Sequence, residues 1–584
     1  MYISTVRIEN FRNFRSVEIP LQRKTILMGE NNSGKTNLMR ALTLPLASSE
    51  LGLFRKTLEW DDINKECKEE FFDFVRYRKD DILAGKMTVA ELSEHLPCIR
   101  VKLSFKPDED TDDVYYLKKL LSSLTSDSES YTICYRFFIK DVRKLLERLI
   151  AVLRSNDFNQ STKHSLLPIE NFVSEITTVS EEDSIGFSEL QHFRYALIPA
   201  ERDEFSSNIR NIGSKLFVRL LSSKLTPEKN SSIENAYNVF FDNIRKTATV
   251  NELINWQNNP MLENAKNFFS DLELQPNMPN LYSILNSARL GLKEGPLSEE
   301  GLGHRNLLFL CVLLNAVATP NENDPRFSLL LIDEADAHLS QSSQLIFNSF
   351  LNSKVVSSNR NLQVVFDTHS LNFLQKENLA NIVIVSDGEA YGLSEFFEPD
   401  ELNYLSRNPN LDIYNYLFAK RVILVEGPSE ELLIRAHRSA CRDEINQTTI
   451  ISFHKGFKNI IKTWKKIHTT SESKLAIIRD GDDEPKAQEA HESLDCNNVH
   501  SFTTNSYTLE SEIVEQGKNF ELLINLFFEK LGWEAFASKE ELIAKWKENK
   551  LTAGLVLCQE YGMGNLPEFE LPQHINNALQ WLGD

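Results

Sequence analysis

Two groups of residues have the types and spacing needed for phosphate and metal chemistry. The first follows a short apolar run and reads Gly29, four further residues, then Gly34-Lys35-Thr36. Glycines let backbone N–H groups surround a phosphate, the lysine reaches the β- and γ-phosphates, and the threonine hydroxyl ligates Mg²⁺. We therefore predict a strand, a nucleotide-binding loop and a helix, with ATP contacts from Gly29, Asn31, Asn32, Ser33, Gly34, Lys35, Thr36 and Asn37.

The second group consists of carboxylates that follow two apolar stretches near the end of the chain. Glu426 ends one stretch and Glu430 lies where a helix would begin, while Asp480 and Asp482 follow the other stretch. Parallel strands would bring these ends to one edge of a sheet. Clustered carboxylates repel one another unless cations neutralise them, so we expect two Mg²⁺ or Mn²⁺ ions there.

A further carboxylate pair suits hydrolysis of a nucleotide. Residues 327–332 form an apolar run that ends in Asp333 and Glu334. An aspartate at the end of such a strand can hold the Mg²⁺ shell, and the adjacent glutamate can polarise the attacking water. We assign these two roles to Asp333 and Glu334.

The composition describes an ordinary globular protein of several domains. The chain has 584 residues, of which 41% are hydrophobic and 25% charged, and its net charge of −20 disfavours non-specific attraction to DNA. Seven scattered cysteines without a C-x-x-C pair suit a reducing cytoplasm. The N-terminus does not resemble a signal peptide, and the longest apolar run, 307–318, is too short to cross a bilayer. We expect a cytoplasmic protein with no membrane partner.

The remaining stretches are less informative. Alternation over 2–8 and 17–21 predicts strands that lead into the phosphate-binding loop. Residues 55–190 are charged and irregular, apart from helical periodicity at 138–154. Residues 205–290 are mostly helical in pattern. The long separation between Lys35 and the next nucleotide motif exceeds the need of one βαβ connection and predicts an inserted subdomain.

The N-terminal motifs resemble a known family of ATPases. Asn10-Phe11-Arg12, together with the glycine-lysine loop, is similar to the N-terminal lobe of ABC ATPases of the RecF and SMC type. Under that resemblance Ser298, Gly301 and Gly303 are the signature motif, which grips the γ-phosphate of ATP held by a second subunit. The motif departs from the usual Ser-Gly-Gly-Gln. His369, after the apolar run 362–366, resembles the residue that senses the γ-phosphate.

The C-terminal carboxylates resemble those of a Toprim domain, which pairs Glu-Gly-x-x-Glu with Asp-x-Asp. The resemblance implies that Glu426 is a base or metal ligand, and that a Leu-Glu segment supplies another metal ligand. We choose Glu510 for this ligand, with Glu512 as the alternate. It also implies a lysine that stabilises charge on the scissile phosphate. The candidates are Lys550, which we choose, and Lys547 and Lys545, although a solvated surface lysine explains any one of them.

An ABC ATPase followed by a Toprim domain resembles the OLD (overcoming lysogenization defect) family. The implied fold is α/β, with an ABC-type ATPase head, a mostly helical insertion and a Toprim domain built on a parallel sheet. The implied function is ATP-linked, metal-dependent cleavage of DNA in anti-phage defence, by a homo-oligomer. Gabija-type and retron-associated relatives imply a second component, either a helicase-like protein or a retron reverse transcriptase with its msDNA. The expected domains are an N-terminal ATPase lobe with charged insertions (1–204), a helical insertion suited to dimerisation (205–290), a C-terminal ATPase lobe (291–418) and a Toprim nuclease domain with a helical tail (419–584).

A different class of function fits part of the same pattern. A DNA-binding clamp of the RecF or SMC kind would use ATP as a conformational switch and carry an inactive Toprim domain. The intact carboxylates at 426, 430, 480 and 482 argue against that alternative. A Toprim primase or topoisomerase is disfavoured because no zinc-binding cysteine set and no nucleophilic tyrosine can be identified.

Overall fold

The computed structural model divides the chain into two compact units. The first takes its residues from 1–46, 54–186 and 365–584, and the second from 47–53 and 187–364. The residues that the structure describes are 1–29, 32–48, 58–108, 117, 121–125, 128–155, 163–178, 184–200, 220–221, 225–247, 291–292, 295–296, 299–318, 327–353, 361–374, 377–386, 388–395, 419–441, 448–452, 461, 464–465, 468, 473–481, 489, 492–505, 508–534 and 536–583.

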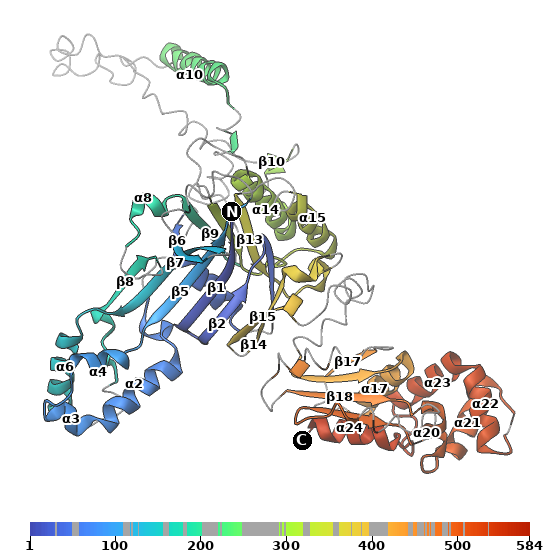
Figure 1. Cartoon of the computed structure of the whole chain (residues 1–584). Coiled ribbons are helices and arrows are strands. Elements are labelled where there is room, and N and C mark those ends of the chain that lie inside the picture. Colours follow the sequence, from blue (N-terminus) through green and yellow to red (C-terminus); the bar gives the residue numbers. More distant parts are fainter. Residues whose placement is uncertain are drawn as a thin grey trace, which may run out of the picture. The chain divides into compact units, whose positions relative to one another are not determined.

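An antiparallel sheet opens the chain (Figure 1). Its strands follow the order β2-β1-β5-β7-β6, and β8 pairs with β7. Apolar and polar residues alternate along β5, so that one face of this strand is buried and the other is more exposed. The bounds are β1 (Tyr2–Phe11), β2 (Phe14–Pro20), β5 (Ile99–Lys106), β6 (Leu121–Thr125), β7 (Ser128–Ile139) and β8 (Phe172–Thr177).

The second sheet carries the phosphate-binding loop and the Asp333-Glu334 pair on different strands. Its order is β15-β14-β3-β13-β12-β9-β4, with β14 parallel to β3 and β12 parallel to β9. Nearly every residue of β3, β12 and β13 is buried, as expected for parallel strands that are covered on both faces. The bounds are β3 (Lys24–Met28), β4 (Ala47–Ser48), β9 (Phe193–Ile198), β12 (Phe327–Ile332), β13 (Leu362–Asp367), β14 (Ile382–Ser386) and β15 (Glu389–Gly392).

The C-terminal region has its own parallel sheet and its own core. The sheet order is β17-β16-β18-β19, and all three pairings are parallel. Helices α17 and α23 pack against each other, and α24 covers β18 and β19 (Figure 1). One hydrophobic core joins the sheet to these helices, from Ile423 to Leu582. The strands are β16 (Arg421–Val425), β17 (Thr449–Ser452), β18 (Lys474–Arg479) and β19 (Val499–Thr503).

The other described elements are mostly helices. A short two-stranded pair, β10 with β11, precedes the long helix α14. The bounds are α1 (Lys35–Thr43), η1 (Trp60–Asp62), α2 (Lys65–Tyr77), α3 (Lys79–Leu83), α4 (Val89–Glu94), α6 (Val142–Ser155), α7 (Lys163–Leu166), η4 (Ile169–Asn171), α8 (Phe187–Leu190), α10 (Pro227–Thr247), β10 (Gly291–Leu292), β11 (Gly295–Pro296), α14 (Leu302–Ala318), α15 (Gln341–Leu351), η8 (Leu371–Leu374), η9 (Leu379–Asn381), η10 (Leu393–Glu395), α17 (Pro428–Cys441), α20 (Leu509–Glu515), α21 (Asn519–Leu531), α22 (Lys539–Glu548), α23 (Lys550–Gly562) and α24 (Gln573–Gly583).

The expected α/β class, with a parallel sheet in the C-terminal part, is confirmed. The expectation that 55–190 is irregular is wrong for its described part, because β5, β7 and β8 extend the first sheet there. Within the expected helical insertion, 205–290, the described residues 225–247 include helix α10, and most of the other residues lie outside the described part.

All seven cysteines lie in the described part of the chain, and all are free thiols. Among the described helices, none combines the length and apolar character needed to span a membrane.

Candidate functional site

The phosphate-binding loop is shaped by backbone positions that leave no room for a side chain. Gly34, the residue before α1, has a φ of 113°, a left-handed conformation that favours glycine. A Cβ on Gly29 would lie 2.2 Å from the carbonyl oxygen of Val385, on the neighbouring strand β14. Lys35 is buried, and its Nζ donates to the Gly29 carbonyl oxygen at 2.9 Å. Thr36 is exposed at the first turn of α1, and Asn31 lies outside the described residues.

The turn between β1 and β2 supports this loop. Asn13 Nδ2 donates to the Ser33 carbonyl oxygen at 3.0 Å, and Asn37 Nδ2 donates to Asn13 Oδ1 at 2.7 Å. Arg12 then donates to Asn37 Oδ1 at 2.8 Å and pairs with Asp62 at 2.7 Å. Asn13 was not among the predicted site residues. Its position in the Asn10-Phe11-Arg12-Asn13 turn was the available signal.

The Asp333-Glu334 pair occupies a tight turn at the end of β12. The Asp333 N–H donates to the Ile198 carbonyl oxygen at 2.9 Å, so the turn is fixed to the end of β9. Glu334 is exposed and has a φ of 48°, which is unusual for a residue with a side chain. The backbone conformation of this turn therefore sets the directions in which the Asp333 and Glu334 side chains leave the chain.

The signature segment contacts the loop that follows this turn. A Cβ on Gly303 would lie 2.6 Å from the His338 carbonyl oxygen, whereas one on Gly301 would meet nothing within 4 Å. Asn306 Nδ2 donates to the Ala337 carbonyl oxygen at 3.1 Å. Asn306 and Gly303 thus join α14 to the loop after β12. Ser298 lies outside the described residues.

His369 follows the end of β13 and is exposed. The preceding residue, Thr368, donates its N–H to the Leu27 carbonyl oxygen at 3.3 Å. This places the segment of His369 beside β3, the strand that leads into the phosphate-binding loop.

In the C-terminal sheet, Glu426 and Asp480 lie at the ends of two adjacent parallel strands. Val425 of β16 aligns with Ile478 of β18, so Glu426 is the neighbour of Arg479 in register. Arg479 Nε donates to Glu426 Oε1 at 3.0 Å. The sequence prediction did not include Arg479, although it directly precedes the predicted Asp480. Asp482 lies outside the described residues.

Glu430 is buried in the first turn of α17. Its Oε2 accepts the Gly427 backbone N–H at 3.1 Å. Burial raises the pKa of the Glu430 carboxyl, and the negative charges of Glu510 and Glu426 raise it further. The charges of Glu510 and Glu426 therefore both act on the Glu430 carboxyl.

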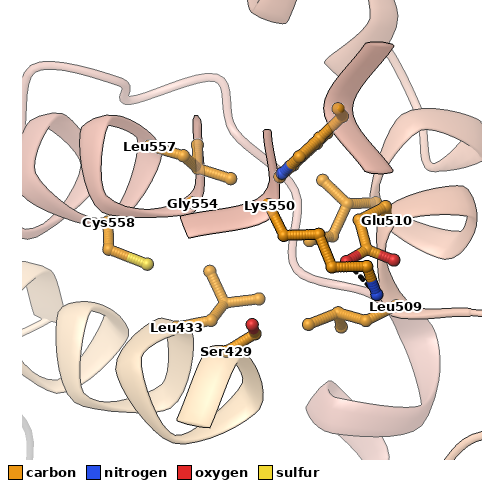
Figure 2. A pocket seen from close by; sticks show the side chains of 10 residues that line it. Ser429, Leu433, Leu509, Glu510, Lys550, Gly554, Leu557 and Cys558 are labelled. Atoms are coloured by element: carbon orange, nitrogen blue, oxygen red, sulfur yellow. Dashed lines mark ion pairs between the residues drawn. The ribbon is translucent and has the colours of Figure 1, made fainter. Parts of the chain in front are cut away.

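Glu510 and Lys550, both predicted from the sequence, form an ion pair. Lys550 Nζ lies 3.0 Å from Glu510 Oε1, and Figure 2 shows the ammonium group directed at the carboxylate. The pair borders a small pocket whose walls come from α17, α20, α22 and α23. The other oxygen, Glu510 Oε2, is buried and accepts no hydrogen bond from the described residues. A buried carboxylate oxygen of this kind calls for a donor or a cation.

The alternates take other partners. Glu512 is buried and its Oε1 accepts from Asn505 at 3.4 Å, with His574 Nδ1 at 3.9 Å. Lys545 pairs with Glu548 at 3.3 Å on the exposed side of α22. Lys547 is exposed. Of these three lysines, Lys550 is the one that pairs with Glu510.

Whether these residues can hold metal ions depends on their charge and spacing. No three His, Cys, Asp or Glu side chains among the described residues are grouped closely enough to hold one. Two of the carboxylates instead have cationic partners from the chain, Arg479 and Lys550. These two cations face four described carboxylates, those of Glu426, Glu430, Asp480 and Glu510. When all six groups are ionised the net charge is −2, which a divalent ion would balance. The buried Glu510 Oε2 also fits a metal ligand.

Two separate ranges of the chain match known protein families. Residues 1–374 match the family described as AAA ATPase domain, and residues 417–482 match the overcoming lysogenization defect protein-like TOPRIM domain. Endonuclease GajA of Bacillus cereus (strain HuB5-5) is 22% identical over 516 residues, which cover 74% of this chain and 70% of that protein.

Two other similarities concern the ATPase half. The DNA replication and repair protein RecF of Oenococcus oeni (strain ATCC BAA-331 / PSU-1) is 22% identical over 374 residues, 61% of this chain and 91% of that protein. The solved SMC head domain from Thermotoga maritima covers 67% of this chain and 98% of its own length at 15% identity. Its TM-score of 0.27 is too low to bear on the fold.

Proposed function

Because the chain belongs to the AAA ATPase domain family and carries an OLD-like TOPRIM domain, we propose that it is an ATP-linked, metal-dependent DNA endonuclease. The observation that carries the proposal is the parallel register of β16 and β18, which puts Glu426 and Asp480 at one edge of the C-terminal sheet, with Glu430 in the first turn of the helix that follows β16. A relative that aligns over most of the chain is named an endonuclease, which supports the same activity.

Each residue of the C-terminal centre has a role in this proposal. Glu426, Glu430, Asp480, Asp482 and Glu510 would hold Mg²⁺ or Mn²⁺. Such ions, when bound, activate water and stabilise the leaving oxygen. Glu430 is kept in place by the Gly427 N–H, so its carboxylate needs little reorganisation. Lys550, which is half-exposed, would stabilise negative charge on the scissile phosphate, and Glu426 would accept a proton from water.

The ATPase half would bind and hydrolyse ATP. The loop from Gly29 to Asn37 would surround the phosphates, with Lys35 on the β- and γ-phosphates. Thr36 and Asp333 would hold Mg²⁺, Glu334 would polarise water and His369 would sense the γ-phosphate. The signature residues Ser298, Gly301 and Gly303 would act on ATP held by a second copy. We propose that this cycle gates access of DNA to the carboxylates.

A homo-oligomer follows from that use of the signature segment. Helix α10 offers one apolar surface for it, since Tyr237, Phe240, Phe241 and Ile244 recur at helical spacing and Phe240 is 58% exposed. We also propose a role in anti-phage defence, with a second component of the system as partner. Light scattering of the purified chain and of Phe240→Glu tests the oligomer, which the variant should weaken.

The test of the proposed activity is cleavage of plasmid and linear DNA in Mg²⁺ or Mn²⁺, with and without ATP. Glu430→Ala should lose cleavage. Its matched control is Glu431→Ala, one residue along α17, whose side chain pairs with Arg435 at 2.9 Å in an exposed position. Lys35→Ala should change only the response to ATP. Cleavage that persists in Glu430→Ala would overturn the assignment. ATP-dependent DNA binding without any cleavage would favour the clamp instead.

A further inference from the structure

Arg479 is the last residue of β18, and strand register forces it against Glu426. The parallel pairing of Val425 with Ile478 makes Glu426 and Arg479 the next pair across the two strands. The resulting ion pair has an Nε–Oε1 distance of 3.0 Å. The guanidinium therefore sits among the carboxylates of the proposed metal site, at a position that no sequence motif marked.

An arginine cannot release its charge by losing a proton. A second cation on Glu426 would therefore be repelled by the guanidinium for as long as Arg479 keeps this contact. DNA brings a phosphate, and arginine binds phosphate through two parallel N–H bonds. A DNA phosphate can thus replace Glu426 as the partner of the Arg479 guanidinium, which leaves the Glu426 carboxylate available to a metal ion.

Exposure decides whether such an exchange is feasible. The side chains of Arg479 and Glu426 are 27% and 24% exposed. The Lys24–Glu377 pair at the start of β3 provides a contrast, because its side chains are 0% and 4% exposed. The buried pair is closed to solvent, whereas the Arg479 pair is open to solvent and to substrate.

We propose that Arg479 is a positioning residue that holds Glu426 in the free protein and passes to a DNA phosphate when substrate binds. The inference rests on the proposed metal-dependent cleavage of DNA. Its consequence is a coupling in which DNA tightens metal binding and metal tightens DNA binding by the same factor.

The experiment is calorimetric titration of Ca²⁺ into the full chain, with and without a short DNA duplex that a gel shows to stay intact. Arg479→Met keeps the length of the side chain and removes its charge, and Arg479→Lys keeps the charge without the fork. Arg435→Met is the matched control, because Arg435 forms an exposed ion pair with Glu431 on α17. It removes one positive charge from the same domain.

Without DNA, Arg479→Met should bind Ca²⁺ about threefold to tenfold more tightly than the wild type, as expected for loss of a partly exposed ion pair. DNA should tighten Ca²⁺ binding in the wild type and in Arg435→Met, and much less in Arg479→Met. Arg479→Lys should fall between them. The readout is binding, so a purely structural role for Arg479 would not reproduce it.

Two results would contradict the inference, and they are distinguishable. If the wild type binds Ca²⁺ no better than Glu430→Ala, both the metal site and this inference fail. If binding depends on Glu430 but Arg479→Met responds to DNA as the wild type does, the coupling role of Arg479 alone fails.

Discussion

The two candidate centres of this chain are held in different ways. In the ATPase part, backbone fit decides the geometry, since Gly29 and Gly303 each leave less than 3 Å for a Cβ and Gly34 and Glu334 have positive φ values. In the C-terminal part, interactions between charged side chains decide the geometry. Glu426 and Glu510 are held by Arg479 and Lys550, and the pKa of Glu430 is raised by burial and by its neighbours.

This difference indicates how each centre fails. The geometry of a site built on close backbone contacts is sensitive to one added methyl group. A site built on paired charges tolerates changes of shape better than changes of charge. The predicted ligand of the ATPase part has a fixed form, whereas under our proposal Glu426 exchanges the guanidinium of Arg479 for a metal ion.

The largest effect is expected at Lys550. Lys550→Met should lower the rate of DNA cleavage about 100- to 1000-fold, as is typical when one stabiliser of transition-state charge is removed. The free energy of unfolding should also fall, by about 1–3 kcal/mol, because Glu510 is only 5% exposed and its buried carboxylate loses its cationic partner. Cleavage rates and urea unfolding measure the two quantities. Lys545→Met is the control, and an equal loss in both variants would remove the special role of Lys550.

A large effect on stability is expected from His574, which is buried in α24. Burial lowers the pKa of His574 to about 4, although Glu512 raises it. The unfolded chain takes up this proton near pH 6.5 and the folded chain does not, so stability falls as the pH drops from about 6.5 to 4. The loss reaches about 3 kcal/mol at the acid end.

His574→Leu should remove this acid-sensitive component. Scanning calorimetry from pH 7 to pH 4.5 should show a smaller decrease in unfolding temperature than in the wild type. An identical slope in both proteins would mean that His574 is protonated in the folded state.

In the ATPase part a single methyl group should have a comparable effect. In Gly29→Ala the new Cβ would lie 2.2 Å from a backbone carbonyl oxygen of β14, which cannot rotate away. Overpacking of this kind costs about 1–3 kcal/mol, so affinity for a fluorescent ATP analogue should fall roughly tenfold to a hundredfold. DNA cleavage without ATP should be unaffected. Unchanged ATP affinity would show that the loop is less tightly fitted than the contact implies.

The smallest effect is expected for the same substitution in the C-terminal part. A Cβ on Gly554, in the middle of α23, would meet nothing within 4 Å. Gly554→Ala should therefore stabilise the protein by about 0.5–1 kcal/mol through helix propensity alone. Thermal unfolding measures this, and a destabilised variant would argue against the contrast between the two parts.

Local sequence patterns were enough to predict much of this arrangement. Glycine spacing predicted the loop at Gly29, and apolar runs that end in carboxylates predicted the edges that hold Asp333 and Glu426. Each of these signals lies within one strand and its following turn. The roles of these residues stay predictions.

What the sequence did not reveal depends on contacts between distant segments. Arg479 becomes visible only when the register of β16 and β18 is known, and Asn13 only when the first hairpin is placed against the loop. The sheet formed by β5 and β7 was also missed, although apolar and polar residues alternate along β5 and this local pattern was available.

The most direct test of the proposed nuclease centre is the rate of plasmid cleavage in Mn²⁺ by Glu426→Gln, compared with the wild type. Glutamine keeps the shape of the side chain and can still accept a hydrogen bond from Arg479, but it lacks the charge. Cleavage should fall by at least about 100-fold, while binding of the ATP analogue stays at the wild-type level. Cleavage at the wild-type rate would contradict the assignment of the nuclease to the C-terminal carboxylates.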